Sequence, residues 1–325
     1  MRTRPALVTA AFVLAAIPLS VPAQGFVPTK PVEFITHTGV GAGGDVLARF
    51  IASAMEKEKL LPVRMHVANK TGGGGQTAMA YLVEKRGDTH TISVYTGIWI
   101  SNPLMLPEAK TTMKDLTSVI RLLGEPGLIV VKSDSPIKTF GDFIEAAKRK
   151  PGELKQSGSL VGGRDWVLRQ LIGKQTGANW AFIPFPTMAD RLGALLGGHT
   201  TIQLVDPQEA GEHIRSGALR VVVQVADKRL GPYPNVPTLK EAGFDVPSMT
   251  LYRGVVAPPG IPREVVAYWE NVFAKFVQTP TWKKYLEDNV LEDGFQRSAD
   301  QSKFFDEYAD TMRAIFRDGG IKVVR

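Results

Sequence analysis

The fold is decided by the stretch Pro31-Val-Glu-Phe-Ile-Thr-His-Thr-Gly39-Val-Gly41-Ala-Gly43-Gly44-Asp45-Val-Leu-Ala-Arg49. Residues 32–36 are short, apolar and β-branched, which predicts a buried strand. Glycines then free the backbone, and Asp45 stands where the N-cap of a helix belongs. Apolar residues recur at helical spacing from there to Met55. The stretch therefore predicts a strand, a glycine loop and a helix whose free first-turn N–H groups favour an anion.

The glycine loop has two other interpretations. Glycines between a strand and a helix are often needed only for the tight turn. Gly39, Gly41 and Gly44 also fit the dinucleotide fingerprint G-x-G-x-x-G, which requires an acidic residue after the next strand to bind the ribose. The next expected strand, 63–67, runs into Asn69-Lys70 and supplies none. An anion site is favoured.

The N-terminus has the pattern of a cleavable signal peptide over residues 1–23. Arg2 and Arg4 precede an apolar segment, 6–17, and Val21-Pro22-Ala23 supplies a small-residue cleavage site. The apolar segment is too short for a comfortable membrane span. We expect cleavage after Ala23 and export to a bacterial periplasm. The chain has no cysteine, so an exported protein of this size must depend on its apolar core.

The charge of the chain is mildly positive. The formal net charge is +7, and loss of Arg2 and Arg4 with the signal peptide leaves +5. Lysines and arginines are scattered, and no basic patch interleaved with aromatic residues is present, which argues against nucleic-acid binding. A mild positive charge instead helps to attract small anions.

The first third of the chain repeats the unit of strand, loop and helix. Strands are expected at 32–36, 63–67 and 91–95, and helices follow the first two. Such succession implies a parallel sheet with right-handed crossovers. The loops after the strands then lie together at one sheet edge, where such sheets bind ligands.

The middle of the chain repeats the pattern and predicts a second lobe. Continuously apolar segments predict strands covered on both faces; they lie at 128–132, 154–156, 181–185, 200–205 and 219–225. The proline-rich tail predicts irregular connections, followed by helices that pack on the first lobe. The first of these starts at Pro262, and Ser298-Ala-Asp-Gln301 predicts a capping box for the last. We expect lobe 1 at 24–124 plus 231–325 and lobe 2 at 125–230.

The sequence does not point to catalysis. The five histidines are scattered without metal spacing, and G-x-S-x-G is absent. Gly173-Lys174-Gln175 lacks the Ser or Thr of a P-loop. We expect no cofactor, no metal and no enzymatic activity. Two alternatives stay open: an exported α/β enzyme acting on a small organic acid, and a receptor that presents its ligand to a sensor kinase.

Several motifs, in order and spacing, resemble one family over nearly the whole mature chain. They are Gly41-Ala-Gly43-Gly44-Asp45-Val-Leu-Ala-Arg49, Val67-Ala-Asn69-Lys70-Thr-Gly72-Gly-Gly74-Gly75, Leu195-Leu-Gly197-Gly198, Val236-Pro237-Thr238-Leu239-Lys-Glu241-Ala-Gly243-Phe and Ala257-Pro258-Pro259-Gly260-Ile-Pro262. The chain thus resembles the tripartite tricarboxylate transporter substrate-binding proteins, the Bug or TctC-type periplasmic receptors.

The resemblance implies an α/β, two-lobed type II periplasmic-binding fold, with a mostly parallel sheet in each lobe. Such a receptor closes on a small carboxylate and delivers it to integral-membrane transporter subunits; we expect a monomer. The implied ligand contacts in lobe 1 are Gly41, Ala42, Gly43, Gly44, Asp45, Gly73, Gly74, Gly75, Gln76, Thr96 and Gly97. Those in lobe 2 are Ser159, Val161, Gly162, Gly163, Arg164, Phe185, Thr187 and Asp206.

Lobe 2 departs from the family pattern, so the resemblance does not transfer the ligand's identity. The family often has Pro-Tyr-Lys-Gly where this chain has Pro184-Phe185-Pro186-Thr187. Phe185 and Trp166 suit a less polar ligand, although a place in the core is the favoured interpretation. Arg164, at a predicted helix start, is a candidate clamp for a distal carboxylate. Asp45 is expected to be a structural cap paired with Arg49.

Overall fold

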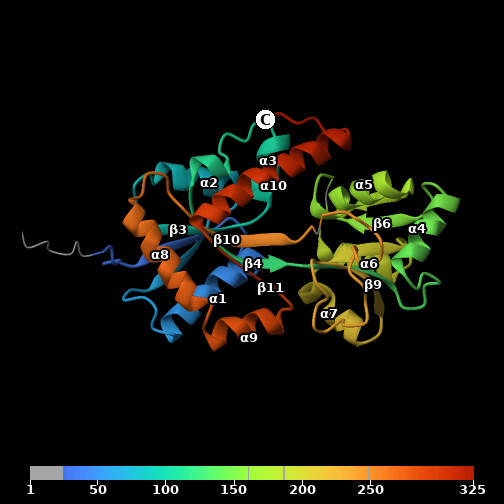
Figure 1. Ribbon diagram of the computed structural model, residues 1–325, viewed down its shortest axis with the longest axis horizontal. Helices are drawn as coiled ribbons and strands as arrows, with labels where there is room; N and C mark the ends of the chain where they lie inside the picture. Colours follow the sequence, from blue (N-terminus) through green and yellow to red (C-terminus); the bar gives the residue numbers. More distant parts are fainter. Residues whose placement is uncertain (1–24, 160, 186, 248) are drawn as a thin grey trace, which may run out of the picture.

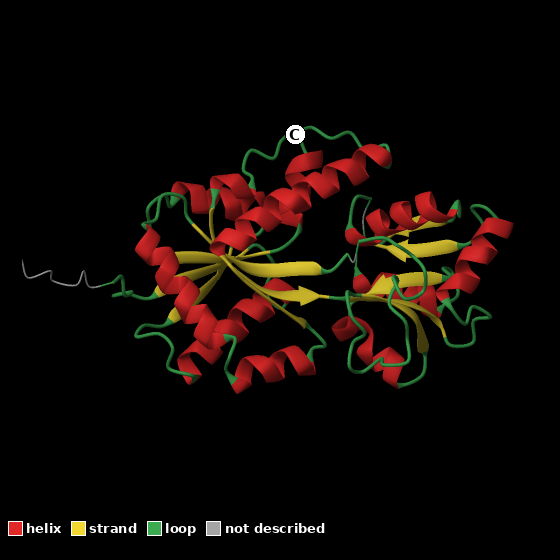
Figure 2. Cartoon of the chain, in the orientation of Figure 1, coloured by secondary structure: helices red, strands yellow, loops and turns green. Residues whose placement is uncertain are grey.

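The chain folds into two lobes that lie side by side along its long axis (Figures 1 and 2). This computed structural model describes residues 25–159, 161–185, 187–247 and 249–325. The signal peptide predicted at 1–23 lies outside the described residues. Each lobe has a β-sheet with helices on its faces, which confirms the predicted α/β class.

The sheet of the first lobe has six strands in the order β11-β4-β10-β3-β1-β2. They are β1 (Val32–Thr36), β2 (Met65–Asn69), β3 (Thr91–Tyr95), β4 (Thr117–Glu125), β10 (Leu251–Ala257) and β11 (Glu292–Arg297). β1 pairs in parallel with β2 and β3, as predicted. β4, β10 and β11 were not expected from the sequence, and all the pairings they form in this sheet are antiparallel.

The helices of the first lobe cover both faces of its sheet. They are α1 (Gly43–Lys57), α2 (Gln76–Glu84), α3 (Ile98–Met105), α8 (Arg263–Phe276), α9 (Pro280–Asp288) and α10 (Ser298–Asp318). Phe34 packs in one core cluster with residues of α1 and α8, whereas its neighbour Ile35 packs in another with residues of α2 and α10. Both side chains are fully buried, and the burial of each stabilises the folded state by about 2 kcal/mol. Burial on both faces explains the continuous apolar run in β1.

The sheet of the second lobe has five strands in the order β7-β6-β8-β5-β9. They are β5 (Gly127–Lys132), β6 (Lys155–Gly158), β7 (Ala181–Pro184), β8 (Ile202–Val205) and β9 (Leu219–Val225). β6 pairs in parallel with β7 and β8, and β5 is antiparallel to β8 and β9. The helices of this lobe are α4 (Phe140–Arg149), α5 (Arg164–Thr176), α6 (Met188–Leu196) and α7 (Pro207–Arg215).

The last helix, α10, differs from its prediction in two ways. Its N-cap is Arg297 and no side chain caps it, so the capping box predicted from Ser298 was wrong. Gln301 is instead fully buried and donates its Nε2 hydrogen to the carbonyl of Val255. The helix also extends beyond the first lobe, because Phe316 packs in the same core cluster as Trp166 of α5. It therefore forms an apolar contact between the lobes.

Candidate functional site

Two cavities lie where the lobes face each other. The larger, called here the wide cavity, has a volume of about 540 Å³. The second has a volume of about 450 Å³ and is called the loop-41 cavity, because Gly41, Ala42 and Gly43 line it. Asp206 and Glu209 line both, so the two cavities are adjacent parts of one interlobe cleft. These volumes are typical of small-molecule sites.

The wide cavity brings together eight of the predicted contact residues: Gly74, Gly97, Ser159, Val161, Gly162, Gly163, Arg164 and Asp206. They come from the carboxyl ends of strands in both lobes, as expected for loops of α/β sheets. Apolar side chains supply much of the remaining lining, including Ile98, Met105 and Leu251. The cavity is thus a mixed polar and apolar surface.

The first glycine loop lines the loop-41 cavity. Gly41, Ala42 and Gly43 face Asp206 and Glu209 across it. The two glycine loops predicted to hold one carboxylate therefore line different cavities in this structure.

The remaining predicted contacts line neither cavity: Gly44, Asp45, Gly73, Gly75, Gln76, Thr96, Phe185 and Thr187. Some of them have structural partners instead. The side chain of Gln76 exchanges two hydrogen bonds, of 2.9 and 3.1 Å, with the backbone of Thr111. Thr187 caps α6 by accepting from the N–H of Asp190 at 3.1 Å. Trp166 is 8% exposed and packs in the core, which confirms the interpretation favoured from the sequence.

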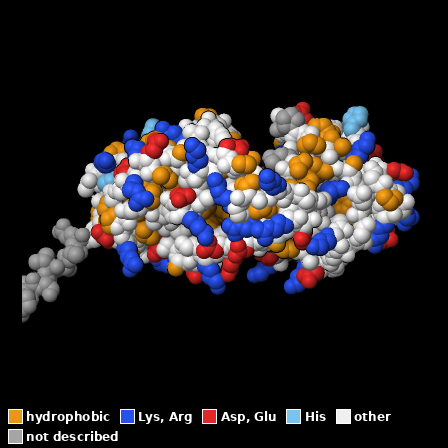
Figure 3. All heavy atoms as spheres, turned by 90° about the horizontal axis from the view of Figure 1, so that it is seen from above, with side chains coloured by type: hydrophobic (Ala, Val, Ile, Leu, Met, Phe, Trp, Pro, Cys, Tyr) orange, Lys and Arg blue, Asp and Glu red, His pale blue; other side chains and the backbone are white. Residues whose placement is uncertain are grey.

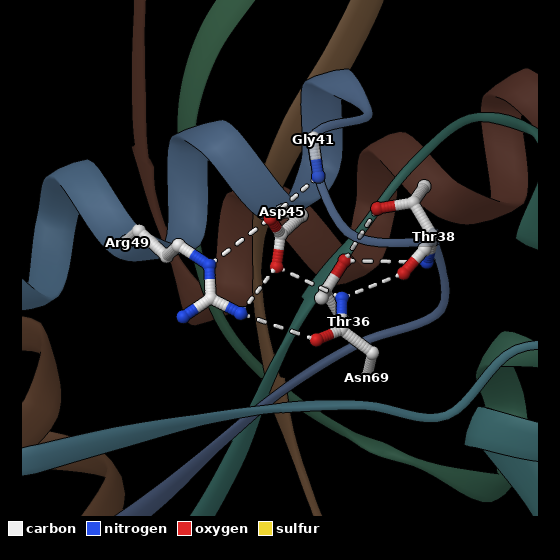
Figure 4. A network of polar contacts seen from close by, with 6 residues as sticks. All are labelled: Thr36, Thr38, Gly41, Asp45, Arg49 and Asn69. Carbon is white, nitrogen blue, oxygen red and sulfur yellow. Dashed lines mark hydrogen bonds and ion pairs between the residues drawn. The ribbon is translucent and has the colours of Figure 1, made fainter.

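Asp45 holds the first glycine loop in shape (Figure 4). It was predicted to be an N-cap, but the N-cap is Ala42, and Asp45 lies in the first helical turn. Its carboxylate accepts hydrogen bonds from the N–H of Gly41 at 2.9 Å, from Arg49 at 3.0 Å and from Asn69 at 2.8 Å. The predicted pair with Arg49 is confirmed. The hydrogen bonds from Arg49 and Gly41 lower the pKa of Asp45 to about 2, so the carboxylate is ionised at neutral pH.

At the start of α1, Gly43 is exposed and lines the loop-41 cavity, whereas Gly44 is buried. Asp45 and Val46 direct their N–H groups to the carbonyl of Ala42, whereas Gly43 and Gly44 donate to no group within the described residues. A Cβ on Gly44 would lie 2.8 Å from Oγ1 of Thr38, so any larger residue there would require the Thr38 side chain to move. Two free N–H groups at a helix N-terminus favour a bound anion.

Arg164 lies in the cleft as predicted, but protein groups already bind it. Its Nη2 pairs with Asp206, and its Nη1 donates to the carbonyl of Glu125 at 3.1 Å. Burial opposes the charge of the guanidinium, yet the nearby Asp206 carboxylate outweighs this and raises the pKa of Arg164. The side chain is only 10% exposed. The arginine therefore has a counter-ion before any ligand enters.

Arg253 is a charged cleft residue that sequence reasoning missed. It lies on β10, and its Nε forms an ion pair of 2.7 Å with Oε1 of Glu125. The side chain lines the loop-41 cavity, and its Nη2 is 3.1 Å from the position of a Cβ on Gly43. Burial and the charge of Arg253 lower the pKa of His37 to about 4, so this histidine is neutral at pH 7. The ion pair of Arg253 and Glu125 therefore lies beside the N-terminus of α1.

Glu209 brings negative charge to the opposite wall. It lies in the first turn of α7 and is open to the cleft. Burial and the charge of Asp206 raise its pKa. Elsewhere on the surface, Figure 3 shows lysines and arginines dispersed among acidic side chains on the face drawn. The described part of the chain contains no cluster of three potential metal ligands, and none of its helices is long and apolar enough to span a membrane.

Comparisons with known proteins agree on one family. The model described as "Tripartite tricarboxylate transporter family receptor" matches residues 47–321. The UPF0065 protein in the gbd 5'region of Cupriavidus necator is 30% identical over 318 residues, covering 97% of this chain and 95% of that protein. A TctC solute-binding protein from Polaromonas is 25% identical with a TM-score of 0.77, covering 89% of this chain and 99% of that one.

A further solved structure is Rpa4515 of R. palustris with adipate. It is 23% identical with a TM-score of 0.78, covering 91% of this chain and 99% of that one. This likeness is one of fold.

Proposed function

Because the chain belongs to the tripartite tricarboxylate transporter receptor family, we propose that it captures a small organic carboxylate between its lobes and delivers it to a membrane transporter of that class. The observation that carries the proposal is the cleft, in which Gly43, with its free helix amide, and Arg253 face residues of the second lobe. A relative of the same fold holds adipate, a small dicarboxylate. The protein acts by binding, without catalysis, as a periplasmic monomer after cleavage behind Ala23.

Capture involves closure of the lobes about the connecting segments. The sequence predicts lobe 1 at 24–124 plus 231–325, lobe 2 at 125–230, and hinges near 124–127 and 226–231. Phe244 packs against Phe140 of α4, and Leu239 donates its N–H to the carbonyl of Gln224 in β9, so we place the second hinge after residue 244 instead. The ion pair of Arg253 with Glu125 and the hydrogen bond from Arg164 to the same residue lie at the first hinge. The apolar contact between α10 and α5 joins the two lobes, so it must be kept or must slide as they close. This favours a limited rotation of one lobe relative to the other.

Thermal unfolding with a ligand panel tests the proposal. The mature protein is unfolded and refolded to remove carried-over ligand, and is then heated with mono-, di- and tricarboxylates, amino acids, aromatic acids and NAD(P). A ligand at about a hundred times its Kd adds about 2.7 kcal/mol, which raises the Tm by about 5 °C. A shift with one class of carboxylate supports the proposal. A shift with NAD(P) alone, or turnover of an acid, contradicts it.

A further inference from the structure

The loop-41 cavity has the guanidinium of Arg253 on one wall and two carboxylates on the other, and Glu125, the counter-ion of Arg253, also lines it. On the first lobe, Gly43, whose N–H group is free, lies beside the guanidinium of Arg253. On the second lobe, Asp206 and Glu209 project from the start of α7. A cavity with these two walls distinguishes carboxylate ligands by the charge of the group at the opposite end of the molecule.

The first-lobe wall suits a carboxylate. A guanidinium has five N–H donors; Glu125 lies 2.7 Å from Nε and offsets the charge of Arg253, whereas Nη1 and Nη2 donate no hydrogen bond to the described residues and are available to a ligand. The adjacent amides of α1 add the positive end of a helix dipole. A carboxylate here receives charge-assisted hydrogen bonds from Arg253 and neutral ones from the backbone.

The second-lobe wall suits a cation. Asp206 is neutralised by Arg164, whereas Glu209 forms no ion pair within 4 Å with any residue that the structure describes, although Arg191 and Arg164 are near enough to oppose the rise of its pKa. A second carboxylate on the ligand would be repelled by the negative charges of Asp206 and Glu209. Arg164 would not offset this repulsion, because its guanidinium is already paired with Asp206. A ligand ammonium group would instead pair with Glu209.

We propose that the ligand is a carboxylate that also carries a cationic group, as in an amino acid. Arg253 binds its carboxylate end and Glu209 its cationic end. This inference rests on the proposed function and narrows its ligand class. It separates this chain from the relative that holds adipate, whose two ends are both acidic.

Calorimetric titration with matched pairs of ligands tests the inference. The pairs are 4-aminobutanoate against succinate and 6-aminohexanoate against adipate, in which an ammonium replaces one carboxylate, together with α-amino acids. The refolded mature protein should bind the amino member of at least one pair about tenfold or more tightly than the diacid. Equal or tighter binding of the diacids overturns the inference and leaves the proposed function standing. Binding of no carboxylate of any class would defeat both.

Two variants test which residue binds which end of the ligand. Glu209→Gln should remove most of the preference for the amino member, whereas Glu212→Gln, an exposed glutamate of the same helix paired with Arg215, should leave it unchanged. Arg253→Gln should weaken amino acids and diacids alike by about tenfold or more, because it removes the carboxylate partner that both share. Thermal unfolding of each variant verifies that it folds. A folded Glu209→Gln protein with unchanged preference contradicts the assignment.

Discussion

Replacing Asp45 by Asn should loosen the glycine loop and destabilise the protein. The carboxylate accepts hydrogen bonds from Gly41, Arg49 and Asn69, and its side chain is only 2% exposed. An amide at this position has one oxygen for these donors and places its own NH₂ against one of them. The change therefore leaves a buried donor without an acceptor, which costs about 1 to 3 kcal/mol.

The pKa of Asp45 gives a second measure of the same effect. A carboxyl held at about 2 rather than 3.8 contributes at most about 2.4 kcal/mol at neutral pH. Arg49 is 51% exposed, so solvent screening reduces this contribution. We expect a loss of about 1 to 2 kcal/mol on replacement. Because the folded pKa is depressed, this stability is fully present above pH 4 and is lost as the pH falls towards 2.

Urea unfolding of both proteins at pH 6 and at pH 3 measures the loss. The difference between wild type and Asp45→Asn should be clear at pH 6 and smaller at pH 3. Asp306→Asn is the control, because its pair with Lys114 spans 3.3 Å between exposed side chains, and it should change stability by less than about 0.5 kcal/mol. An Asp45→Asn protein as stable as wild type at pH 6 would refute the structural role assigned to this carboxylate.

Further predictions concern stability and backbone packing. Burial and the charge of Asp227 raise the pKa of Glu292 to about 7, so stability should fall as the pH rises from about 4.5 through 7. Glu292→Gln should therefore raise the urea midpoint at pH 8 and leave it unchanged at pH 4; equal midpoints at pH 8 would contradict this. A Cβ on Gly254 would lie 2.1 Å from the carbonyl oxygen of Ile120, so Gly254→Ala should cost about 3 kcal/mol. Gly193→Ala, in α6 with nothing within 4 Å of its Cβ, should instead stabilise by about 0.5 to 1 kcal/mol, and similar midpoints for the two variants would count against the packing of β10 on β4.

The sequence predicted strands from apolar segments that end at turn residues, although it missed β10, whose Val255 and Val256 are buried in different core clusters. β1, β3 and β9 begin and end at the predicted residues for this reason. β11, with the sequence EDGFQR, is a polar edge strand whose place depends on pairing with β4. Such pairing comes from tertiary structure, so neither periodicity nor propensity indicated it. The missing cap of α10 has a similar cause, since burial of Gln301 against Val255 replaces the reciprocal capping bonds.

The sequence predicted those parts of the candidate site that are built from glycine loops. Glycine patterns located the loops at 41–45 and 72–76 and the second-lobe loop at 159–164. Residues 41–43 and most of the second-lobe loop line the cleft, whereas the loop at 72–76 lines it only with Gly74. Arg253 was missed because its strand lies in the tail that was expected to be irregular. Glu209 was missed because a single glutamate in a helix has no local signal; its position depends on how the lobes face each other.

The central claim is capture of a carboxylate between two closing lobes, and small-angle X-ray scattering tests it most directly. The refolded mature protein is measured alone and with a saturating concentration of the carboxylate that gives the largest thermal shift. The radius of gyration should fall with ligand, because both walls of the cleft must approach to contact a small molecule. A radius of gyration that stays constant while calorimetry reports saturation would contradict capture by closure.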